Sequence, residues 1–322
     1  MSVLTDVVVI IFSSLVIFFA GDKFGSASSK IGAYFNVPNS VKGATIDAIS
    51  SSAPELLVTL FGLMAFGSFE IGVGTIVGSA IFNLLFIPAL CVLIAKRDFL
   101  LGKEVIYREG GFYAAALLFL FLALLYSGEW GIGIALILFA GYVVYVHYIA
   151  KHIKTYHKTH KQKSSNEIRI EKELLLAFIA LIFIGVSTYL LTGHSEALAQ
   201  KMNVPSIIIG FTVVAVATSL PDGTISIAST VRGTNDDAIS NMLGSNIFNI
   251  FVGLSLPVLI ATLIYGPVEI AFHNIEIVAA LFFVTLGIIA GLHINNVISR
   301  RKALVFLLIF AAFQGYFIYL AL

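Results

Sequence analysis

Two short stretches of the sequence carry the residues that could do chemistry. The first, residues 50–55, reads Ser-Ser-Ser-Ala-Pro-Glu, and the second, residues 217–222, reads Ala-Thr-Ser-Leu-Pro-Asp. Each places a proline and a carboxylate inside a long apolar run. A carboxylate at bilayer depth costs about 2.5–3.5 kcal/mol, and a proline removes a backbone donor and opens the preceding helical turn. Two matched features of this kind indicate a cation site built from both halves of the chain.

Each stretch has a companion of the pattern Gly-Ser-x-x-x-Asn further along the chain, at residues 78–83 and 244–249. The serine and the asparagine are four residues apart, which places them on one face of a helix. A helix that breaks before a proline also leaves backbone carbonyls free to bind a cation. The candidate ligands are the side chains of Glu55, Asp222, Ser51, Ser52, Thr218, Ser219, Ser79, Ser245, Asn83 and Asn249, with the carbonyls of Ala48, Ser51, Ala215 and Thr218.

These candidate ligands offer only oxygen atoms, and the four stretches contain no cysteine or histidine. That composition argues against zinc or copper and favours hard cations. Ca²⁺ takes about 6–8 oxygen ligands, and the two carboxylates together balance the charge of one Ca²⁺. Hydroxyl and amide oxygens suit Na⁺, whereas Mg²⁺ gives up its water too reluctantly to fit well. The sequence therefore predicts Ca²⁺ and Na⁺ as transported ions, and no cofactor.

The composition predicts an all-α membrane protein. Of the 322 residues, 59% are hydrophobic and only 11% are charged, against about 25% charged in a soluble domain. Many apolar runs are long enough to cross a bilayer as a helix. The net charge of +1 says little about partners, because the charges are confined to loops, and no basic groove indicates a nucleic-acid partner. The single cysteine, Cys91, excludes a disulfide within the chain.

The apolar runs predict ten membrane spans in two inverted repeats of five helices. The first repeat covers residues 1–150 and the second covers 173–322, with a basic cytoplasmic loop at 151–172 between them. The predicted spans are 3–20 with an amphipathic extension to 35, then 39–66, 70–96, 109–127, 130–150, 173–193, 205–231, 238–264, 270–292 and 302–321.

The distribution of basic residues predicts the orientation in the membrane. If the loop at 151–172 is cytoplasmic, only Lys201 falls on the opposite side, and Lys42 lies near the cytoplasmic start of span 2. All other Lys and Arg residues fall on the cytoplasmic side, as the positive-inside rule requires. Both termini then lie outside the cytoplasm, and we expect a multi-pass protein of the cell membrane. With five spans in each half, the two halves enter the membrane in opposite directions.

The two halves also match in sequence at a nearly constant offset. The segment Asn36-Val37-Pro38 recurs as Asn203-Val204-Pro205, and the block 78–83 recurs as 244–249. At the same offset as the first segment, Gly43, Thr45, Ala48, Ser52 and Pro54 recur as Gly210, Thr212, Ala215, Ser219 and Pro221. Inverted repeats with an odd number of spans, interrupted at matching places, are typical of secondary transporters with a site near the bilayer midplane.

These motifs resemble the two alpha-repeats of the cation/calcium antiporter superfamily. The resemblance rests on residues 45–55 and 74–83 in the first half, and on Pro221-Asp222 and residues 244–249 in the second. Within the superfamily the sequence is most similar to sodium/calcium exchangers, in particular to the potassium-dependent type, which similarly pairs Ser-Ala-Pro-Glu with Ser-x-Pro-Asp.

The resemblance implies a ligand set and a mechanism. Ca²⁺ would be bound by Glu55 and Asp222 with the carbonyls of Ser51 and Thr218. Spans 1 and 6 would slide past the other eight to give alternating access. The implied sodium sites use Ser52, Ser79, Asn83, Ser219, Ser245, Asn249 and the carbonyls of Ala48 and Ala215.

Three positions depart from the family pattern. Ser50 and Ala217 stand where the family usually has glycine, which stiffens the predicted breaks. Asn249 stands where potassium-dependent members have aspartate, and an amide has no charge to hold a third monovalent ion, so K⁺ co-transport is not expected. The position equivalent to Asp47 in the second repeat holds Val214. Asp47 could add charge to the site, line the cytoplasmic path or pair with Lys42, and the sequence leaves these readings open.

The principal alternative function is a proton-coupled H⁺/Ca²⁺ antiporter, in which Glu55 and Asp222 carry protons as well as Ca²⁺. A channel is less consistent with inverted repeats and the lack of a filter-like loop. An enzyme is not expected, because the only Gly-Asp pair, Gly21-Asp22, lacks the Gly-x-Gly-Asp pattern of an intramembrane aspartyl protease, and no serine protease dyad stands out.

Overall fold

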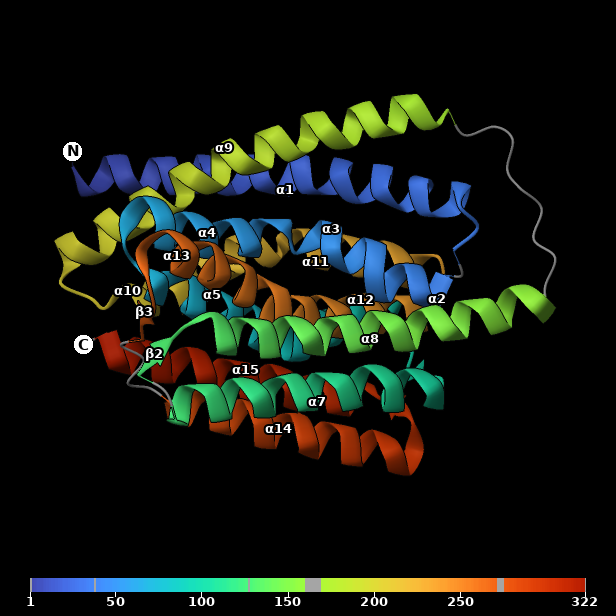
Figure 1. Ribbon diagram of the computed structural model, residues 1–322. Coiled ribbons are helices and arrows are strands. Elements are labelled where there is room, and N and C mark those ends of the chain that lie inside the picture. Colours follow the sequence, from blue (N-terminus) through green and yellow to red (C-terminus); the bar gives the residue numbers. More distant parts are fainter. Residues whose placement is uncertain (1, 38, 127, 160–168, 271–274, 322) are drawn as a thin grey trace.

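The computed structural model describes residues 2–37, 39–126, 128–159, 169–270 and 275–321. Within these residues, nine helical segments are long and apolar enough to cross a membrane, and a bent helix pair adds a tenth. The elements run nearly parallel or antiparallel to one another in a single bundle (Figure 1). The expected all-α membrane fold with ten spans is confirmed.

The first half contains spans 1 to 5. Span 2 is divided by a π-helical turn and a bend, and span 3 by a second π-helical turn. The elements of the first half are α1 (Val3–Tyr34), α2 (Asn39–Lys42), η1 (Gly43–Asp47), α3 (Ala48–Ser51), α4 (Ala53–Phe66), α5 (Phe69–Ile81), η2 (Phe82–Phe86), α6 (Ile87–Ala95), β1 (Phe99–Leu100), α7 (Lys103–Tyr126), β2 (Glu129–Trp130) and α8 (Ile132–Thr159).

The second half repeats this order, which agrees with the predicted internal repeat. Its elements are α9 (Ile170–Met202), α10 (Ser206–Ile209), η3 (Gly210–Val214), α11 (Ala215–Val231), α12 (Asn235–Phe248), η4 (Asn249–Gly253), α13 (Ser255–Tyr265), β3 (Val268–Glu269), α14 (Ile275–Asn295), β4 (Val297–Ile298) and α15 (Arg300–Ala321).

The predicted end of the sixth span and the predicted limits of the loop between the two halves are wrong. The sixth span was expected to end at residue 193, but α9 continues to Met202. The loop expected at 151–172 is shorter, because α8 continues to Thr159 and α9 begins at Ile170; residues 160–168 of that loop lie outside the described residues. The polar end of α9 stays helical because its side chains reach a carboxylate on α1.

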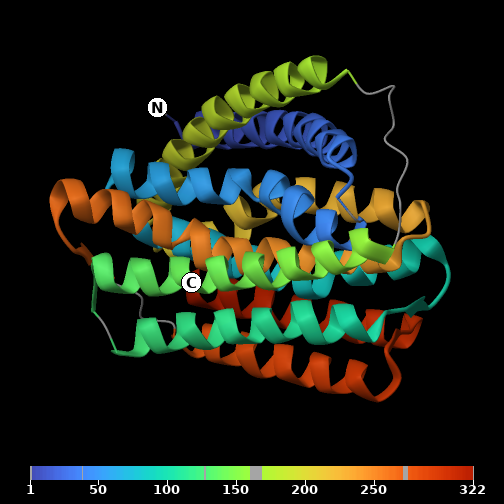
Figure 2. The same ribbon diagram turned by 45° about the vertical axis from the view of Figure 1, so that its right-hand side comes forward.

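The long helices α1 and α9 lie side by side along one face of the bundle (Figures 1 and 2). An ion pair joins them near each end. Lys30 of α1 contacts Glu173 of α9 at 3.0 Å, and Asp6 of α1 is bonded by Lys201 and His194 of α9. Asp6 and Glu173 occupy equivalent positions in the two halves, whereas their lysine partners do not. Both carboxylates are buried, and each requires its cation.

We expect reversal of one charge in the Lys30–Glu173 pair to lower the thermal stability of the purified protein. Glu173→Lys places two cations together, so the apparent Tm should fall by several degrees. The double variant Lys30→Glu with Glu173→Lys restores opposite charges and should recover most of the loss, as a double-mutant cycle on thermal unfolding would measure. Simple addition of the two single effects would show that the pair does not join the helices.

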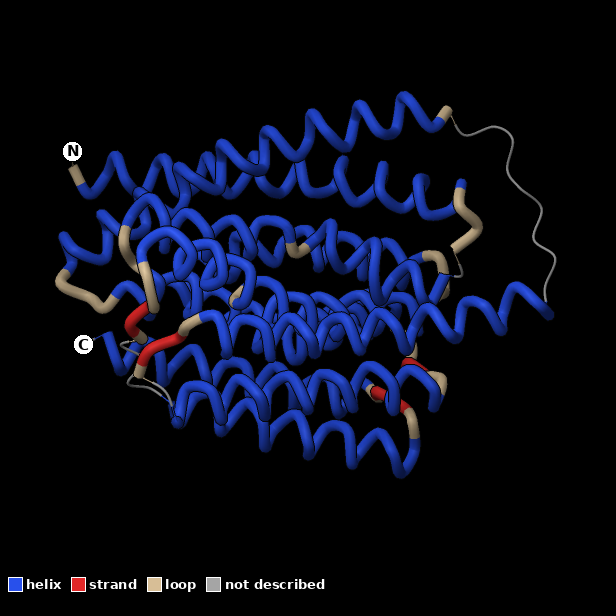
Figure 3. The backbone as a smooth tube through the Cα atoms, viewed as in Figure 1, coloured by secondary structure: helices blue, strands red, loops and turns tan. Residues whose placement is uncertain are grey.

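Four two-residue strands, which the sequence analysis did not predict, tie the halves together. β1 pairs antiparallel with β4, and β2 pairs antiparallel with β3. The two pairs lie at opposite ends of the bundle (Figure 3). Each pair therefore links a loop of the first half to a loop of the second. Strands of two residues are too short for a side-chain alternation that could be recognised in the sequence.

The chain begins and ends at the same end of the bundle, and the adjoining ends of α8 and α9 lie at the other end (Figure 1). The positive-inside argument likewise places the two termini on one side of the membrane and the loop between the repeats on the other. The side of the membrane on which the termini lie, the cell membrane as location and the division into domains 1–150, 151–172 and 173–322 stay predictions.

Candidate functional site

Glu55 is a fully buried carboxylate in the first turn of α4. The hydroxyls of Ser79 on α5 and Ser219 on α11 each donate to its Oε1 atom at 3.3 Å. Ser219 and Ser79 also contact each other at 2.8 Å. Since Ser79 belongs to the first repeat and Ser219 to the second, both halves of the chain meet at this carboxylate.

Asp222 is the matching carboxylate on α11 and is also fully buried. Ser245 of α12 donates to Oδ1 at 2.7 Å, and the Asn83 amide donates to Oδ2 at 2.6 Å. Again one partner comes from each repeat. Neither carboxylate has a Lys or Arg partner among the described ion pairs. The pair is therefore a buried negative centre that favours cations.

Several polar atoms of the candidate ligands are buried without a hydrogen-bond partner among the described residues. They include four oxygens, which are Ser52 Oγ, Glu55 Oε2, Asn83 Oδ1 and Asn249 Oδ1. Buried polar atoms are normally hydrogen-bonded, so each exception needs an explanation. Carboxylate, hydroxyl and amide oxygens are the ligands of hard cations, and the residues present therefore fit Ca²⁺ and Na⁺ as substrates.

Ser51 and Thr218 are equivalent in the two repeats, and their hydroxyls donate to backbone carbonyls of the preceding helical turn. The Ser51 hydroxyl donates to the Asp47 carbonyl at 2.8 Å, and the Thr218 hydroxyl donates to the Val214 carbonyl at 3.0 Å. Such bonds to the preceding turn are common for Ser and Thr inside helices. Ser51 also lies 3.2 Å from the Ser245 hydroxyl, so it contacts the partners of Asp222.

The predicted helix breaks are only half right. In the first repeat the helix bends by 45° at Ser52, between α3 and α4. In the second repeat α11 is continuous and contains Pro221. Its ring packs against α1 at Gly21, where an added Cβ would lie 2.5 Å from the ring. Membrane helices tolerate an internal proline where a neighbouring helix covers it.

The expectation that the first break frees the Ala48 carbonyl is also wrong, because the Ser52 N–H donates to it at 3.0 Å. Ser52 closes the last turn of α3 before the chain bends. Ala215, the equivalent residue, has a carbonyl that accepts from the Thr218 hydroxyl at 3.4 Å. The Ala48 carbonyl also accepts from the Ser51 hydroxyl at 3.2 Å, so both of its lone pairs have donors in this structure. The assignment of the Ala48 and Ala215 carbonyls as ligands stays a prediction.

Four π-helical turns occur at equivalent places in the two repeats, and sequence reasoning missed all of them. The turns η1 and η3 precede the two proline segments, and η2 and η4 contain Asn83 and Asn249. Short π-helical insertions inside α-helices are frequent at functional sites. Asn83 and Asn249 lie at the start of η2 and η4, and both side chains are fully buried.

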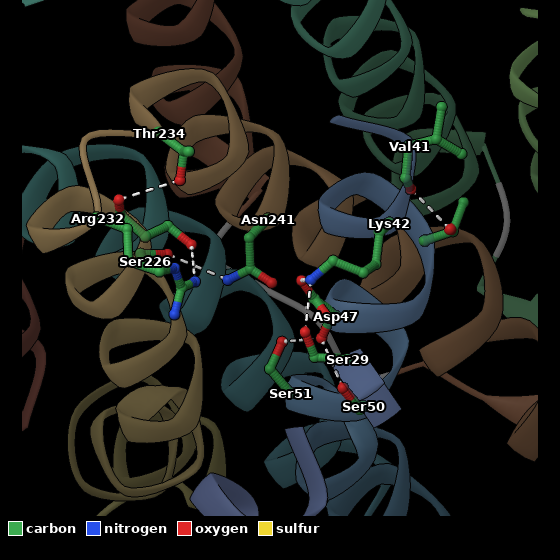
Figure 4. Close-up of polar contacts among 12 residues, drawn as sticks. Ser29, Val41, Lys42, Asp47, Ser50, Ser51, Ser226, Arg232, Thr234 and Asn241 are labelled. Atoms are coloured by element: carbon green, nitrogen blue, oxygen red, sulfur yellow. Dashed lines mark hydrogen bonds and ion pairs between the residues drawn. The ribbon is translucent and has the colours of Figure 1, made fainter. Parts of the chain in front are cut away.

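Two further asparagines contact the site and were not among the candidates. Asn246 accepts from the Asn83 amide at 3.1 Å and donates to the Ala80 carbonyl at 3.2 Å. Asn241, drawn in Figure 4, donates to the backbone carbonyl of Asp222 at 3.3 Å. Asn246 occupies the position equivalent to Ala80, and this polar mismatch within an otherwise matching motif was the signal that could have identified it.

Asp47 pairs with Lys42, which is one of the three readings that the sequence left open. The Lys42 ammonium lies 2.9 Å from the Asp47 carboxylate (Figure 4). Among the described residues, no group of three or more His, Cys, Asp or Glu side chains converges on a common point.

An apolar helical bundle with a buried pair of carboxylates, contacted by hydroxyls and amides from both halves, has the architecture of a membrane transporter for cations. Comparison with known proteins agrees with this class. The profile of the family described as sodium/calcium exchanger protein matches residues 5–151 and 172–319. This chain belongs to the sodium/calcium exchanger family, whose members are exchangers rather than enzymes.

Among the relatives is the inner membrane protein YrbG of Escherichia coli K12. It is 30% identical over 256 residues, which cover 76% of this chain and 77% of YrbG. Among solved structures, the sodium-calcium exchanger NCX_Mj superposes with a TM-score of 0.67 at 23% identity over 97% of this chain and 98% of its own. The H⁺/Ca²⁺ exchanger CAX gives 0.76 at 15% identity over 97% and 81%. These two structures share the fold and differ in the coupling ion named, so the fold leaves the coupling ion open, while membership of the family supports cation/calcium antiport.

Proposed function

We propose that this protein exchanges Na⁺ for Ca²⁺ across a membrane by alternating access, at one site near the midplane between the two repeats. The observation that carries the proposal is the contact of each buried carboxylate with both repeats: Glu55 with Ser79 and Ser219, and Asp222 with Asn83 and Ser245. A relative movement of the two halves would then change the coordination of a bound ion.

The charge of the site supports exchange rather than leak. Glu55 and Asp222 together neutralise one Ca²⁺ or two Na⁺, and an empty site would leave two buried charges uncompensated. The two ion loads therefore compete for the same oxygens. K⁺ is not expected as a substrate.

We assign Ca²⁺ to the two carboxylates with the carbonyls of Ser51 and Thr218. The unpartnered oxygens of Ser52, Asn83 and Asn249 support their assignment to sodium. The proposed sodium ligands are Ser52, Ser79, Asn83, Ser219, Ser245, Asn249 and the carbonyls of Ala48 and Ala215.

A proton-coupled H⁺/Ca²⁺ antiporter is the second candidate. It is favoured by the higher TM-score with CAX and by carboxylates whose described partners are hydroxyls and amides, which can also hydrogen-bond a protonated carboxyl. The unpartnered neutral oxygens favour Na⁺ as the coupling ion, because a proton on a carboxylate leaves them without a ligand.

The test is ⁴⁵Ca²⁺ uptake into proteoliposomes that contain the purified protein. The vesicles are loaded with Na⁺, with Na⁺ plus K⁺, with choline, or with choline and a pH gradient. We expect uptake only with internal Na⁺ and no effect of K⁺. Uptake driven by the pH gradient alone would establish the proton-coupled alternative, and no uptake under any condition would refute Ca²⁺ antiport.

We expect Asn249→Asp to alter the ion coupling. Both amide atoms of Asn249 are buried without a partner, so the substitution adds a negative charge that needs a third cation. Ca²⁺ uptake should become dependent on K⁺ or shift in its pH profile, measured in the same proteoliposomes. Asn241→Asp, on the same span, is the control for an added charge near Asp222. An Asn249→Asp profile that matches the wild type would place the residue outside the ion shell.

A further inference from the structure

One buried ion pair lies beside the site and has no equivalent in the second repeat. Lys42, the last residue of α2, donates to the Asp47 carboxylate at 2.9 Å and to the Ser29 hydroxyl of α1 at 2.6 Å (Figure 4). The Lys42 and Asp47 side chains are only 12% and 6% exposed. The equivalent positions of the second repeat hold Ile209 and Val214, which cannot form such a pair.

This pair is connected to the ion site through the polypeptide. The Asp47 carbonyl accepts from the Ser51 hydroxyl at 2.8 Å. Ser51 lies 3.2 Å from the Ser245 hydroxyl, which in turn donates to Asp222 at 2.7 Å. Lys42 therefore joins α1 to Asp47. The next helical turn contains Ser51, which contacts Ser245, a hydrogen-bond partner of Asp222.

The remaining contact between α1 and the helices of the site is apolar and close. A Cβ added at Gly21 would lie 2.5 Å from the Pro221 ring, and one added at Gly25 would lie 2.7 Å from the Ile225 side chain. Small residues of this kind let helix backbones approach within a membrane.

Among the side-chain hydrogen bonds between described residues, the Lys42–Ser29 bond is the one that joins the α1–α9 pair to the other spans. The other polar side-chain contacts between these two helices and a different element are the ion pairs that join α1 to α9 themselves. Movement of α1 and α9 together along the bundle would keep the ion pairs between these two helices and would break the bond between Lys42 and Ser29.

We propose that Lys42 is a positioning residue that latches α1 to the rest of the bundle and thereby sets the preference between the two orientations of the ion site. The inference rests on the proposed alternating access. An inverted repeat supplies equivalent contacts to both orientations, so a contact that only the first repeat makes stabilises the orientation seen in this structure over the other. The apparent affinity at each membrane face depends on the fraction of molecules open to that face.

The test measures ⁴⁵Ca²⁺/Ca²⁺ exchange, which needs no coupling ion, in vesicles of known orientation, with the half-saturating Ca²⁺ determined separately at each face. One variant is Ser29→Ala. The other combines Lys42→Ile with Asp47→Val, which installs the residues of the second repeat and leaves no buried charge unpaired. We expect half-saturating Ca²⁺ to fall by up to about tenfold at one face and to rise at the other, as for a shift of about 1.4 kcal/mol between orientations.

Two controls lie on α1. Ser14→Ala removes a hydroxyl that bonds only the Ile10 carbonyl of its own helix and should change neither face. Ser29→Thr keeps a hydroxyl and should behave as the wild type. A shift in the same direction at both faces would assign Lys42 to ion binding or folding, and unchanged values would also overturn the latch. Absence of Ca²⁺/Ca²⁺ exchange in the wild type would instead refute the proposed function, and the latch with it.

Discussion

Neutralising either site carboxylate should abolish Ca²⁺ transport. Glu55→Gln and Asp222→Asn keep the size of the side chain and can still accept a hydrogen bond, so Ser79 and Ser245 keep their acceptors. Each variant leaves a single negative charge for a divalent cation. Removing one member of a buried, charge-compensated set costs about 3–5 kcal/mol, which is more than 100-fold in affinity. ⁴⁵Ca²⁺ uptake into Na⁺-loaded proteoliposomes should therefore fall to background.

The matched control is Asp236→Asn at the start of α12. Asp236 accepts a hydrogen bond from the Gly102 N–H at 2.8 Å, and asparagine can keep that bond, so uptake should stay near the wild-type rate. Purified protein of each variant should elute as a single species, which separates lost transport from lost folding. Near-normal exchange in both Glu55→Gln and Asp222→Asn would sink the site assignment.

A methyl group at either of two equivalent glycines should separate the helices that form the site. A Cβ at Gly78 of α5 would lie 2.5 Å from the Phe211 carbonyl oxygen of η3, and one at Gly244 of α12 would lie 2.7 Å from the Ala44 carbonyl oxygen of η1. Both neighbours are backbone, which cannot rotate away. Overpacking of this kind costs about 1–3 kcal/mol, and it displaces Ser79 and Ser245, the next residues along.

We therefore expect Gly78→Ala and Gly244→Ala to lower the apparent Tm by several degrees and Ca²⁺ uptake by more than tenfold. The matched controls are Gly111→Ala and Gly287→Ala, because a Cβ at either position meets no atom within 4 Å. These should be neutral or slightly stabilising, since alanine favours a helix over glycine by about 1 kcal/mol. Equal behaviour of the two sets would show that the crossings of α5 with η3 and of α12 with η1 are looser than described.

Proton coupling and sodium coupling place different demands on the same residues. Either could use the two carboxylates at the meeting point of the repeats, and the structures of NCX_Mj and CAX are both similar to this fold. They differ in the neutral oxygens that a metal ion needs and a proton does not. Ser52, Asn83 and Asn249 each have an unpartnered oxygen. Substitutions of these three residues are therefore the best test of the coupling ion.

Sequence by itself determined the spans, their number, the repeat and the residue types of the site. The reason is physical: a bilayer demands long apolar runs, and a charged or proline-containing segment inside one stands out. Glu55 and Asp222 could be singled out in this way because no lysine or arginine lies near them in the sequence. Asn246 was missed because the candidates were taken from positions that match between the repeats, and Asn246 is equivalent to Ala80.

Only the tertiary structure decided which side chains meet. Ser219 of the second repeat reaches Glu55 of the first, and Asn83 of the first reaches Asp222 of the second, because the halves interlock through glycines that bring the backbones together. The π-helical turns, the unbroken α11 and the choice of Lys42 as the partner of Asp47 depend on the same packing. Local sequence states what each helix can offer, and the crossing of the two repeats determines what each carboxylate contacts.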